Sequence, residues 1–191
     1  MSFLTNVWDF CGGSSEVLYD YDLGQASSHL KVSVVLLPGP FPPAVLISEY
    51  NYPANAPEKM MRTRHGIFLT EEEWSELLKR RDIIESLLQT PGKLPGKNTL
   101  AISPLVSVEI RSTDFLGGQN NEEHYSHYVY LTRHRFDRPQ EKIGIILNAS
   151  KWRNLMDVAS PAIQDALEKL KPSALVDVGK STAADEDMSD D

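Results

Sequence analysis

Cations and aromatic rings that lie close together along the chain are the residues of this sequence that could bind a ligand. In the second half, tyrosines and a phenylalanine flank Arg133 and Arg135. Aromatic rings stack on nucleic-acid bases while nearby cations hold phosphates, so this combination suits a single strand. Aromatic residues are also common on strands for packing alone, which is the alternative interpretation. The candidates are Tyr50, Tyr52, Arg62, Arg64 and His65 in the first half, and Tyr128, Tyr130, Arg133, Arg135, Phe136, Arg138 and Lys142 in the second.

The sequence shows no combination of residues that is typical of an active site or a metal site. His124, His127 and His134 have no cysteine that would complete a plausible zinc set. Lys93 and Lys97 follow Pro-Gly pairs without the glycine-rich spacing of a phosphate-binding loop. No serine, cysteine or carboxylate constellation marks a nucleophile. We therefore expect a protein that is not an enzyme and that needs no metal or other cofactor.

An internal repeat predicts the elements that position the candidate residues. A block of thirteen residues at 66–78 returns at 144–156, at an offset of 78, with glycine, isoleucine, leucine, a helix-capping residue and tryptophan in register. The chain has three tryptophans, so the match of Trp74 with Trp152 argues against chance. A repeat of this kind predicts two copies of one supersecondary unit. The same offset relates two further pairs, Tyr50 with Tyr128 and Tyr52 with Tyr130.

Each block predicts a strand that runs into a helix. Thr70 stands at an N-cap position, and Glu73 three residues later completes a capping box. Asn148 is the corresponding cap of the second helix. Trp74 and Trp152 lead apolar stripes at helical spacing, so we expect both in the core rather than stacked on bases. The Ser160-Pro161 pair inside the second helix predicts a kink or a restart.

Strand-forming stretches precede each block. The first half contains 31–37 and 44–52, separated by a proline-rich turn, and the second half contains 105–111 and 128–136. Together with the strand inside each block, this predicts three strands and a helix per half. The predicted fold class is α+β, with two strand-rich repeats that each end in a helix.

These motifs resemble the single-stranded-DNA-binding domain of the transcriptional coactivator positive cofactor four. The resemblance covers residues 29–88 and 105–170, and its sharpest element is Gly-Ile-x-Leu followed by tryptophan eight residues after the glycine. It implies a curved four-stranded sheet plus a helix in each copy (ββββα), paired through the helices. Two tandem copies in one chain would then pack as an intramolecular pseudo-dimer. Pur-type repeats, which are also strands followed by a helix, are the nearest competing resemblance.

The resemblance also implies which residues contact DNA. Arg133 falls where the family has a basic residue late in the second strand, and Phe136 lies near an aromatic position of the family. Arg64 and Lys142 match the basic turn ahead of Gly-Ile. Arg111 lies near the aromatic and basic hairpin that follows the first strand. The corresponding hairpin of the first half has no cation, so the second half is the expected binder.

Charge is distributed unevenly along the chain, whose net charge is −8. The two ends hold most of the excess acid, and bases gather ahead of the two blocks. A basic sheet with acidic helices and tails can still attract DNA. The predicted division is an acidic, aromatic N-terminal segment at 1–28, repeat 1 at 29–90, a Pro/Gly/Lys linker at 91–104, repeat 2 at 105–172, and an acidic, disordered tail at 173–191.

We therefore expect a monomeric, non-enzymatic protein that binds single-stranded DNA, with a role in transcription or replication implied by the resemblance. The acidic tail is expected to compete with DNA or to bind a protein partner, and the alternative is a solubilising end with no partner. The alternative is a protein-interaction module that kept the fold and lost most of the DNA-binding surface. The single cysteine, Cys11, suits a reducing compartment. With no signal sequence and no long apolar run, we expect an intracellular protein without membrane association, nuclear in a eukaryotic or viral source.

Overall fold

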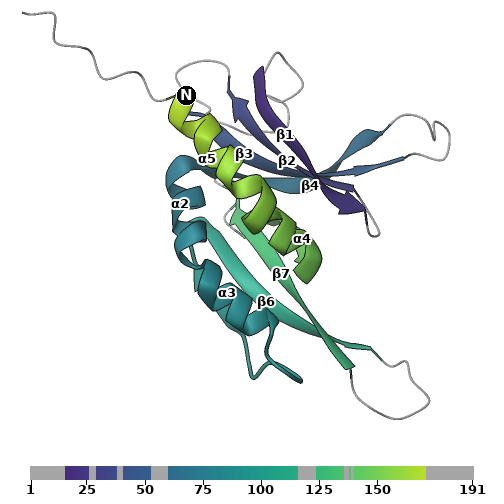
Figure 1. The fold of residues 1–191 in the computed structure, drawn as a ribbon. Coiled ribbons are helices and arrows are strands. Elements are labelled where there is room, and N and C mark those ends of the chain that lie inside the picture. The colour runs from purple at the N-terminus through teal and green to yellow at the C-terminus, as the bar shows by residue number, and fades with distance from the viewer. Residues whose placement is uncertain are drawn as a thin grey trace, which may run out of the picture.

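The computed structural model describes residues 16–25, 29–37, 41–52, 60–115, 124–135, 138 and 140–170. These residues form a mixed α+β fold with two four-stranded antiparallel sheets, in the orders β1-β2-β3-β4 and β5-β6-β7-β8 (Figure 1). The predicted α+β class is confirmed. The strands are β1 Glu16–Gln25, β2 His29–Leu36, β3 Ala44–Asn51, β4 Met61–Thr70, β5 Asn98–Ala101, β6 Val106–Phe115, β7 His124–His134 and β8 Lys142–Asn148. The helices are α2 Glu71–Lys79, α3 Arg81–Leu88, α4 Ala149–Arg153, the π-helix η1 Asn154–Ala159 and α5 Ser160–Lys169.

Each helical segment begins on the sheet that precedes it and ends on the other sheet. The first part of each segment packs on its own sheet, α2 on β3 and β4, and α4 on β7 and β8. The later part crosses over, so that α3 packs on β6 and β7 while α5 packs on β1 and β2. The two segments lie side by side (Figure 1), and the edge strands β4 and β8 are also in contact. The two halves of the chain are therefore interlocked.

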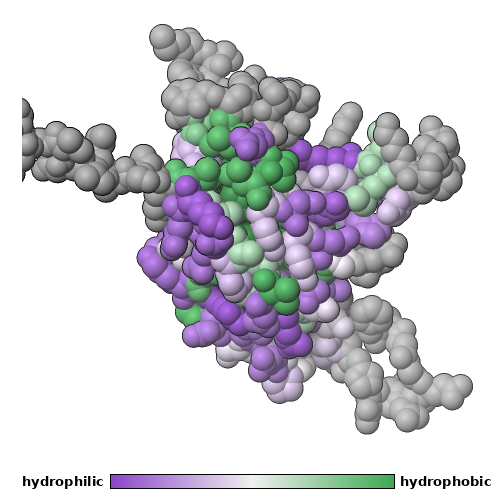
Figure 2. All heavy atoms as spheres, turned by 45° about the horizontal axis from the view of Figure 1, so that its top comes forward, coloured by the Kyte–Doolittle hydropathy of each residue, from purple (hydrophilic) through white to green (hydrophobic). Residues whose placement is uncertain are grey.

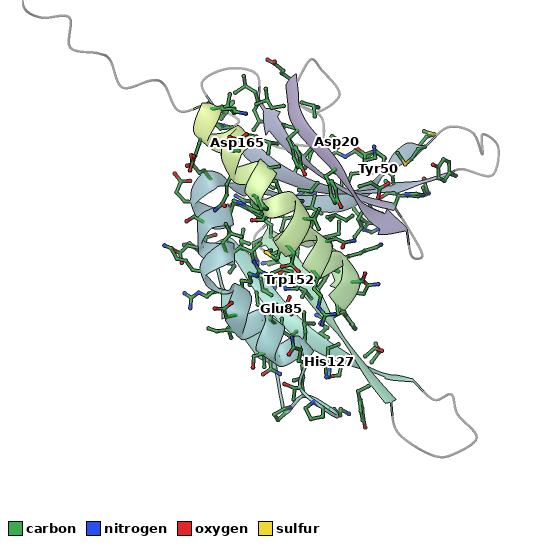
Figure 3. All side chains as sticks on the ribbon, viewed as in Figure 1. Asp20, Tyr50, Glu85, His127, Trp152 and Asp165 are labelled. Carbon is green, nitrogen blue, oxygen red and sulfur yellow. The ribbon has the colours of Figure 1, made fainter. Side chains whose placement is uncertain are left out.

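The main hydrophobic core lies between the helices and the inward faces of the two sheets. It contains side chains from both sheets, among them Ile47 and Leu131, each 0% exposed. Trp74 is 2% exposed and Trp152 is 0% exposed, which confirms that both belong to the core. Figure 3 shows Trp152 in the middle of the molecule. The face shown in Figure 2 is largely hydrophilic, and its largest apolar area lies toward the top of the view.

Both predicted helix caps are present. The Thr70 hydroxyl accepts a hydrogen bond from the Glu73 N–H at 3.3 Å, and the Thr70 N–H donates to the Glu73 carboxylate at 3.0 Å. The Asn148 side chain accepts from the Lys151 N–H at 2.9 Å. Because these bonds satisfy donors that an isolated helix start leaves unpaired, the cap residues fix where each strand ends and each helix begins.

The predicted kink or restart near Pro161 takes the form of a change of helix type, because the backbone stays helical and no side chain caps the start of α5. The chain passes from the π-helix η1 into α5 at Ser160, with proline in the first turn of α5. Proline has no N–H to donate to the turn before it, and a π-helical turn accommodates such a local change of hydrogen bonding. The first helical segment is also divided, at Arg80, which ends α2 and begins α3.

Two strands lie in ranges that were predicted outside the two repeats. β1 lies inside 1–28, which was predicted as an acidic, aromatic N-terminal segment, and β5 lies inside 91–104, which was predicted as a linker. β1 pairs with β2, and β5 pairs with β6, so each completes a sheet of four strands where the sequence predicted three. The N-terminal residues 1–15 and the predicted acidic tail at 173–191 lie outside the described residues.

Strand pairing corrects the predicted match between the tyrosines of the two halves. Ser48 pairs with Gly66 in the first sheet, and Thr132 pairs with Gly144 in the second. The two glycines keep the offset of 78, whereas Ser48 and Thr132 are related by an offset of 84, because the connection between the paired positions is longer in the first half. The tyrosines of β3 and β7 therefore occupy different places in their sheets.

Candidate nucleic-acid interface

The face of the second sheet that points away from the helices brings together several predicted site residues. Side chains alternate along its strands, so Ile110 on β6 and Val129 on β7 point into the core while their neighbours point outward. The residues on this outer face, which we call the sheet-2 face, are Glu109 and Arg111 on β6, Tyr128 and Tyr130 on β7, and Ile146 on β8.

Arg111 and Tyr130 form the centre of the sheet-2 face. The Arg111 guanidinium lies 4.4 Å from the centre of the Tyr130 ring, a cation–π contact. Arg111 is also directly opposite Tyr128 in the β6–β7 ladder. Next to Tyr130 on β8, Ile146 is 55% exposed, so the face is open to solvent on this side. The arrangement offers two aromatic rings and a cation on one exposed surface.

The sheet-2 face also carries one carboxylate, that of Glu109, beside Arg111. The Arg111 guanidinium donates to the Glu109 carboxylate at 2.8 Å, and this hydrogen bond lowers the pKa of Glu109, with further contributions from the charges of Arg111, Lys97 and Lys142. The same hydrogen bond raises the pKa of Arg111. Glu109 therefore stays ionised at neutral pH and offsets part of the positive charge of this face.

Arg133 is not on the sheet-2 face. On β7, Tyr130 and Thr132 point outward. Arg133 follows Thr132, so its side chain points toward the helices, and it is 9% exposed. Its guanidinium donates to the Glu73 carboxylate at 2.6 Å and to the Phe68 carbonyl at 3.3 Å, and it lies 3.9 Å from the centre of the Phe68 ring. The sequence could not show that this cation joins the two halves of the chain, and we exclude it from the candidate interface.

The other candidate cations of the second half lie at or beside the β7–β8 turn. Arg135 and Arg138 each donate to the carboxylate of Glu141, at 3.2 Å and 3.0 Å. Lys142 begins β8 opposite His134 and is exposed. This turn extends the positive charge of the sheet beyond the sheet-2 face, although one acid is shared between two arginines. Phe136 lies outside the described residues.

The candidate residues of the first half gather at one end of the first sheet. Tyr50 is opposite both His29 and Arg62 in the strand ladders, and the Lys31 ammonium lies 5.7 Å from its ring centre. Tyr52 packs edge-on against His29, with ring centres 5.3 Å apart. His65 is exposed on β4, and only the backbone of Arg64 is described. Figure 3 shows Tyr50 on the first sheet, far from His127 on the second.

Carboxylates of β1 contact the basic side chains at this end of the first sheet. The Lys31 ammonium donates to Asp20 at 3.2 Å, and the His29 ring lies 3.4 Å from Asp22. The Ser33 hydroxyl also donates to Asp20, at 2.7 Å. Because these acids lie on the same sheet face as the tyrosines, the first sheet offers a phosphate less positive charge than the second.

The first sheet has apolar residues at the positions where the second sheet has its arginine and tyrosines. Counting from the two helix caps, Ala44 is opposite Thr70, as Tyr128 is opposite Asn148. By the same register, Leu46 corresponds to Tyr130, and Val35 corresponds to Arg111. Val35, Ala44 and Leu46 form a separate apolar cluster with Leu37 and Phe68. The first sheet therefore has no counterpart of the Arg111–Tyr130 pair.

His127 has a structural position rather than a place in a metal site. Its ring nitrogens lie 2.9 Å from the Ser112 hydroxyl and 2.7 Å from the Thr90 carbonyl. The Ser112 hydroxyl also accepts from the Leu94 N–H at 3.2 Å. These contacts tie β7 to the end of α3 and to the segment that follows it. The described residues contain no group of three or more potential metal ligands.

Sequence reasoning missed Glu109 and the connection of Lys97 with this face. Glu109 lies on β6, and Lys97 directly precedes β5, which was predicted as part of a linker. The signal that could have found Glu109 is the alternation in Val106–Arg111, where every second residue is apolar and buried.

Comparisons of the chain with protein-family models and with curated proteins found no match. Within the described part of the chain, every helix is too short or too polar to span a membrane.

Proposed function

We propose that this protein binds single-stranded DNA through the sheet-2 face and does not catalyse a reaction. The observation that carries the proposal is the Arg111 guanidinium above the Tyr130 ring on a strand face that the helices leave open. A base can stack on an accessible tyrosine while the neighbouring guanidinium binds a phosphate. Lys142 and the cations of the β7–β8 turn extend the positive surface along which a strand would run.

The finer organisation that we propose is an intramolecular pseudo-dimer of two ββββα-like repeats. It is supported by the shared strand order of the two sheets, by the caps Thr70 and Asn148 at matching places, and by helices that cross to the opposite sheet. A chain whose halves pair with each other should be monomeric. A role in transcription or replication, and a nuclear location, rest on the resemblance to the coactivator domain.

Binding to oligo-dT at several salt concentrations tests the proposal. Each phosphate contact releases counterions, so the affinity must fall as salt rises. The rival class is a protein-interaction module, which the net charge of −8 favours. Failure to bind oligo-dT, or binding that does not depend on salt, would support that class instead.

Tyr130→Ala is expected to weaken oligo-dT binding by about 1–3 kcal/mol and to leave the salt dependence unchanged, because stacking involves no counterion release. Arg111→Ala should instead reduce the slope of log affinity against log salt by about 1, because one phosphate contact is lost. Titrations of a fluorescent oligo-dT at four or five salt concentrations measure both quantities.

Tyr50→Ala is the matched control for these variants. Tyr50 is also a half-buried strand tyrosine beside a cation, but it lies on the first sheet. If strand binding is confined to the sheet-2 face, Tyr50→Ala should bind oligo-dT as the wild type does. An equal loss in Tyr50→Ala and Tyr130→Ala would contradict the proposed face.

Glu109→Gln is expected to tighten oligo-dT binding, most clearly at low salt. The lowered pKa of Glu109 keeps the carboxylate ionised at the neutral pH of a binding assay, so the wild type always presents this negative charge to a phosphate. The glutamine removes the charge and leaves a carbonyl that can accept from Arg111. The gain in affinity should shrink as salt screens the repulsion. Unchanged or weaker binding at low salt would place the strand away from β6.

A further inference from the structure

Charged side chains join the two halves of the chain at several points. Arg133 of the second half pairs with Glu73 of the first at 2.6 Å, with both side chains about one-tenth exposed. Between the helical segments, Arg81 pairs with Asp157, and Arg153 lies 3.9 Å from Glu85. Each of these ion pairs has one partner in each half.

Glu73 and Lys151 occupy the same place in the two halves. Each is the third residue after its helix cap, the two are related by the offset of the repeat, and each is buried, at 7% and 6% exposure. The carboxylate of Glu49 acts on Lys151: burial lowers the pKa of Lys151, and the charges of Glu49 and Asp22 oppose that change. Lys151 therefore lies in the field of acids on the first sheet, as Glu73 lies beside a cation of the second.

Glu49 and Arg133 also occupy the same place. Glu49 follows Ser48, which pairs with Gly66, and Arg133 follows Thr132, which pairs with Gly144. The same two positions therefore attract each other twice across the halves, through the ion pair of Arg133 with Glu73 and through the electrostatic attraction between Glu49 and Lys151. The sign of the charge is reversed between the two.

Pairing of like halves would place like charges together. Two copies of the first half would bring Glu49 against Glu73, and two copies of the second would bring Arg133 against Lys151. Between the helices, Arg81 would meet Lys79, which is the repeat counterpart of its present partner Asp157. Like charges that are held close in a buried contact disfavour an interface, whereas opposite charges fix its register.

We infer that the reversed charges at Glu49, Glu73, Arg133 and Lys151 are a recognition device, which pairs unlike halves and rejects the like half of a second copy of this chain. The inference rests on the pseudo-dimer organisation proposed above. Its consequence is that the helical surface does not support symmetric self-association, and any association through it must exchange unlike halves between chains.

A variant that erases the discrimination without breaking the fold tests this inference. Glu49→Lys combined with Lys151→Glu keeps the Arg133–Glu73 pair and keeps opposite charges in every unlike contact. It also makes both like pairings attractive. Two first halves would bring the lysine at position 49 against Glu73, and two second halves would bring Arg133 against the glutamate at position 151. Glutamate is favoured at the third position of a helix, so the capped start of α4 is preserved.

Val158→Cys, in a Cys11→Ser background, reports on like pairing. The pairs 81–157 and 85–153 set an antiparallel register in which 158 is opposite 80. Two cysteines at 158 therefore meet only when two second halves pair, and Val158 is 51% exposed, so the substitution is mild. The protein with Val158→Cys and Cys11→Ser is the reporter protein, and the reporter protein that also carries Glu49→Lys and Lys151→Glu is the charge-erased variant. Both are refolded from denaturant at about 100 μM and oxidised, and disulfide-linked dimer is measured on a non-reducing gel.

The charge-erased variant is expected to give at least about ten times more linked dimer than the reporter protein alone, since 1.4 kcal/mol of lost discrimination is tenfold. Equal amounts of linked dimer in the two proteins would overturn the inference. If the double variant fails to refold, denaturant titrations of Glu49→Lys and Lys151→Glu, each alone, take its place. Both single variants should then be less stable than the wild type, and wild-type stability in either one would overturn the inference.

Oligo-dT binding provides an independent readout, because neither Glu49 nor Lys151 lies on the sheet-2 face. The reporter protein and the charge-erased variant should bind oligo-dT equally when compared as monomers. A protein that does not bind oligo-dT but shows the expected difference in linked dimer would refute the proposed function and leave the recognition device intact.

Discussion

Arg133→Met is expected to lower the free energy of unfolding by about 3–5 kcal/mol, because it leaves the buried Glu73 carboxylate without its counter-charge. Methionine fills the space of the aliphatic part of arginine, so the loss reports the missing charge rather than a cavity. Glu73 keeps hydrogen bonds from the Thr70 N–H and from the Ser103 hydroxyl at 2.8 Å, which places the expected loss toward the lower end of that range. Urea denaturation, with the m-value compared between proteins, measures it.

The double variant Arg133→Met with Glu73→Gln separates the charge from the packing. Glutamine still fits a capping box, and a neutral pair in place of a buried ion pair is often as stable as the original. The double variant should therefore recover most of the stability that Arg133→Met alone loses. A double variant as unstable as the single one would show that packing of the guanidinium on Phe68, 3.9 Å away, carries the effect.

The ends of strands and the beginnings of helices could be predicted from the sequence because they depend on residues that are adjacent in the chain. The capping box of Thr70 and Glu73 needs only four consecutive positions, and the structure confirms it. The two tryptophans were predicted to be buried from helical spacing alone, and they are. Local hydrogen bonds and amphipathic periodicity leave a direct record in the sequence.

The first strand of each sheet could not be placed in the same way. β1 does alternate, with Tyr19 and Tyr21 packing against the core and Asp20 and Asp22 on the other side, but acids are uncommon on strands and concealed the pattern. β5 has four residues and follows a segment rich in proline and glycine. Such short edge strands exist because a neighbour offers hydrogen bonds, and that neighbour is distant in sequence.

The register of the strands limited the prediction of the site. A constant offset of 78 matched Tyr50 with Tyr128, but the longer connection between β3 and β4 displaces one strand relative to the other. Arg133 had been matched to a DNA contact, yet its partner Glu73 is distant in sequence and on a different element. Only the pairing of the strands shows which face a cation occupies.

Trp152→Ala is expected to destabilise the protein by about 3–5 kcal/mol, as do other substitutions of buried tryptophan by alanine. Trp152 is 0% exposed and lies near the start of the helical segment that crosses from the second sheet to the first. The substitution opens a cavity that the interlocked halves can close only by moving relative to each other. For a chain of this length the loss corresponds to a decrease in melting temperature on the order of 10 °C, which thermal denaturation followed by circular dichroism can measure.

Trp152→Phe is the informative companion of this variant. The indole N–H of Trp152, like that of Trp74, has no hydrogen-bond partner within the described part of the chain. Phenylalanine removes this buried donor and retains most of the ring, so it should cost much less than alanine. Because Trp74 occupies the matching place in the first half, Trp74→Ala should destabilise by a similar amount, within about 1 kcal/mol. A large loss for Trp152→Ala beside a negligible one for Trp74→Ala would show that the two halves do not share the core equally, and it would count against the pseudo-dimer.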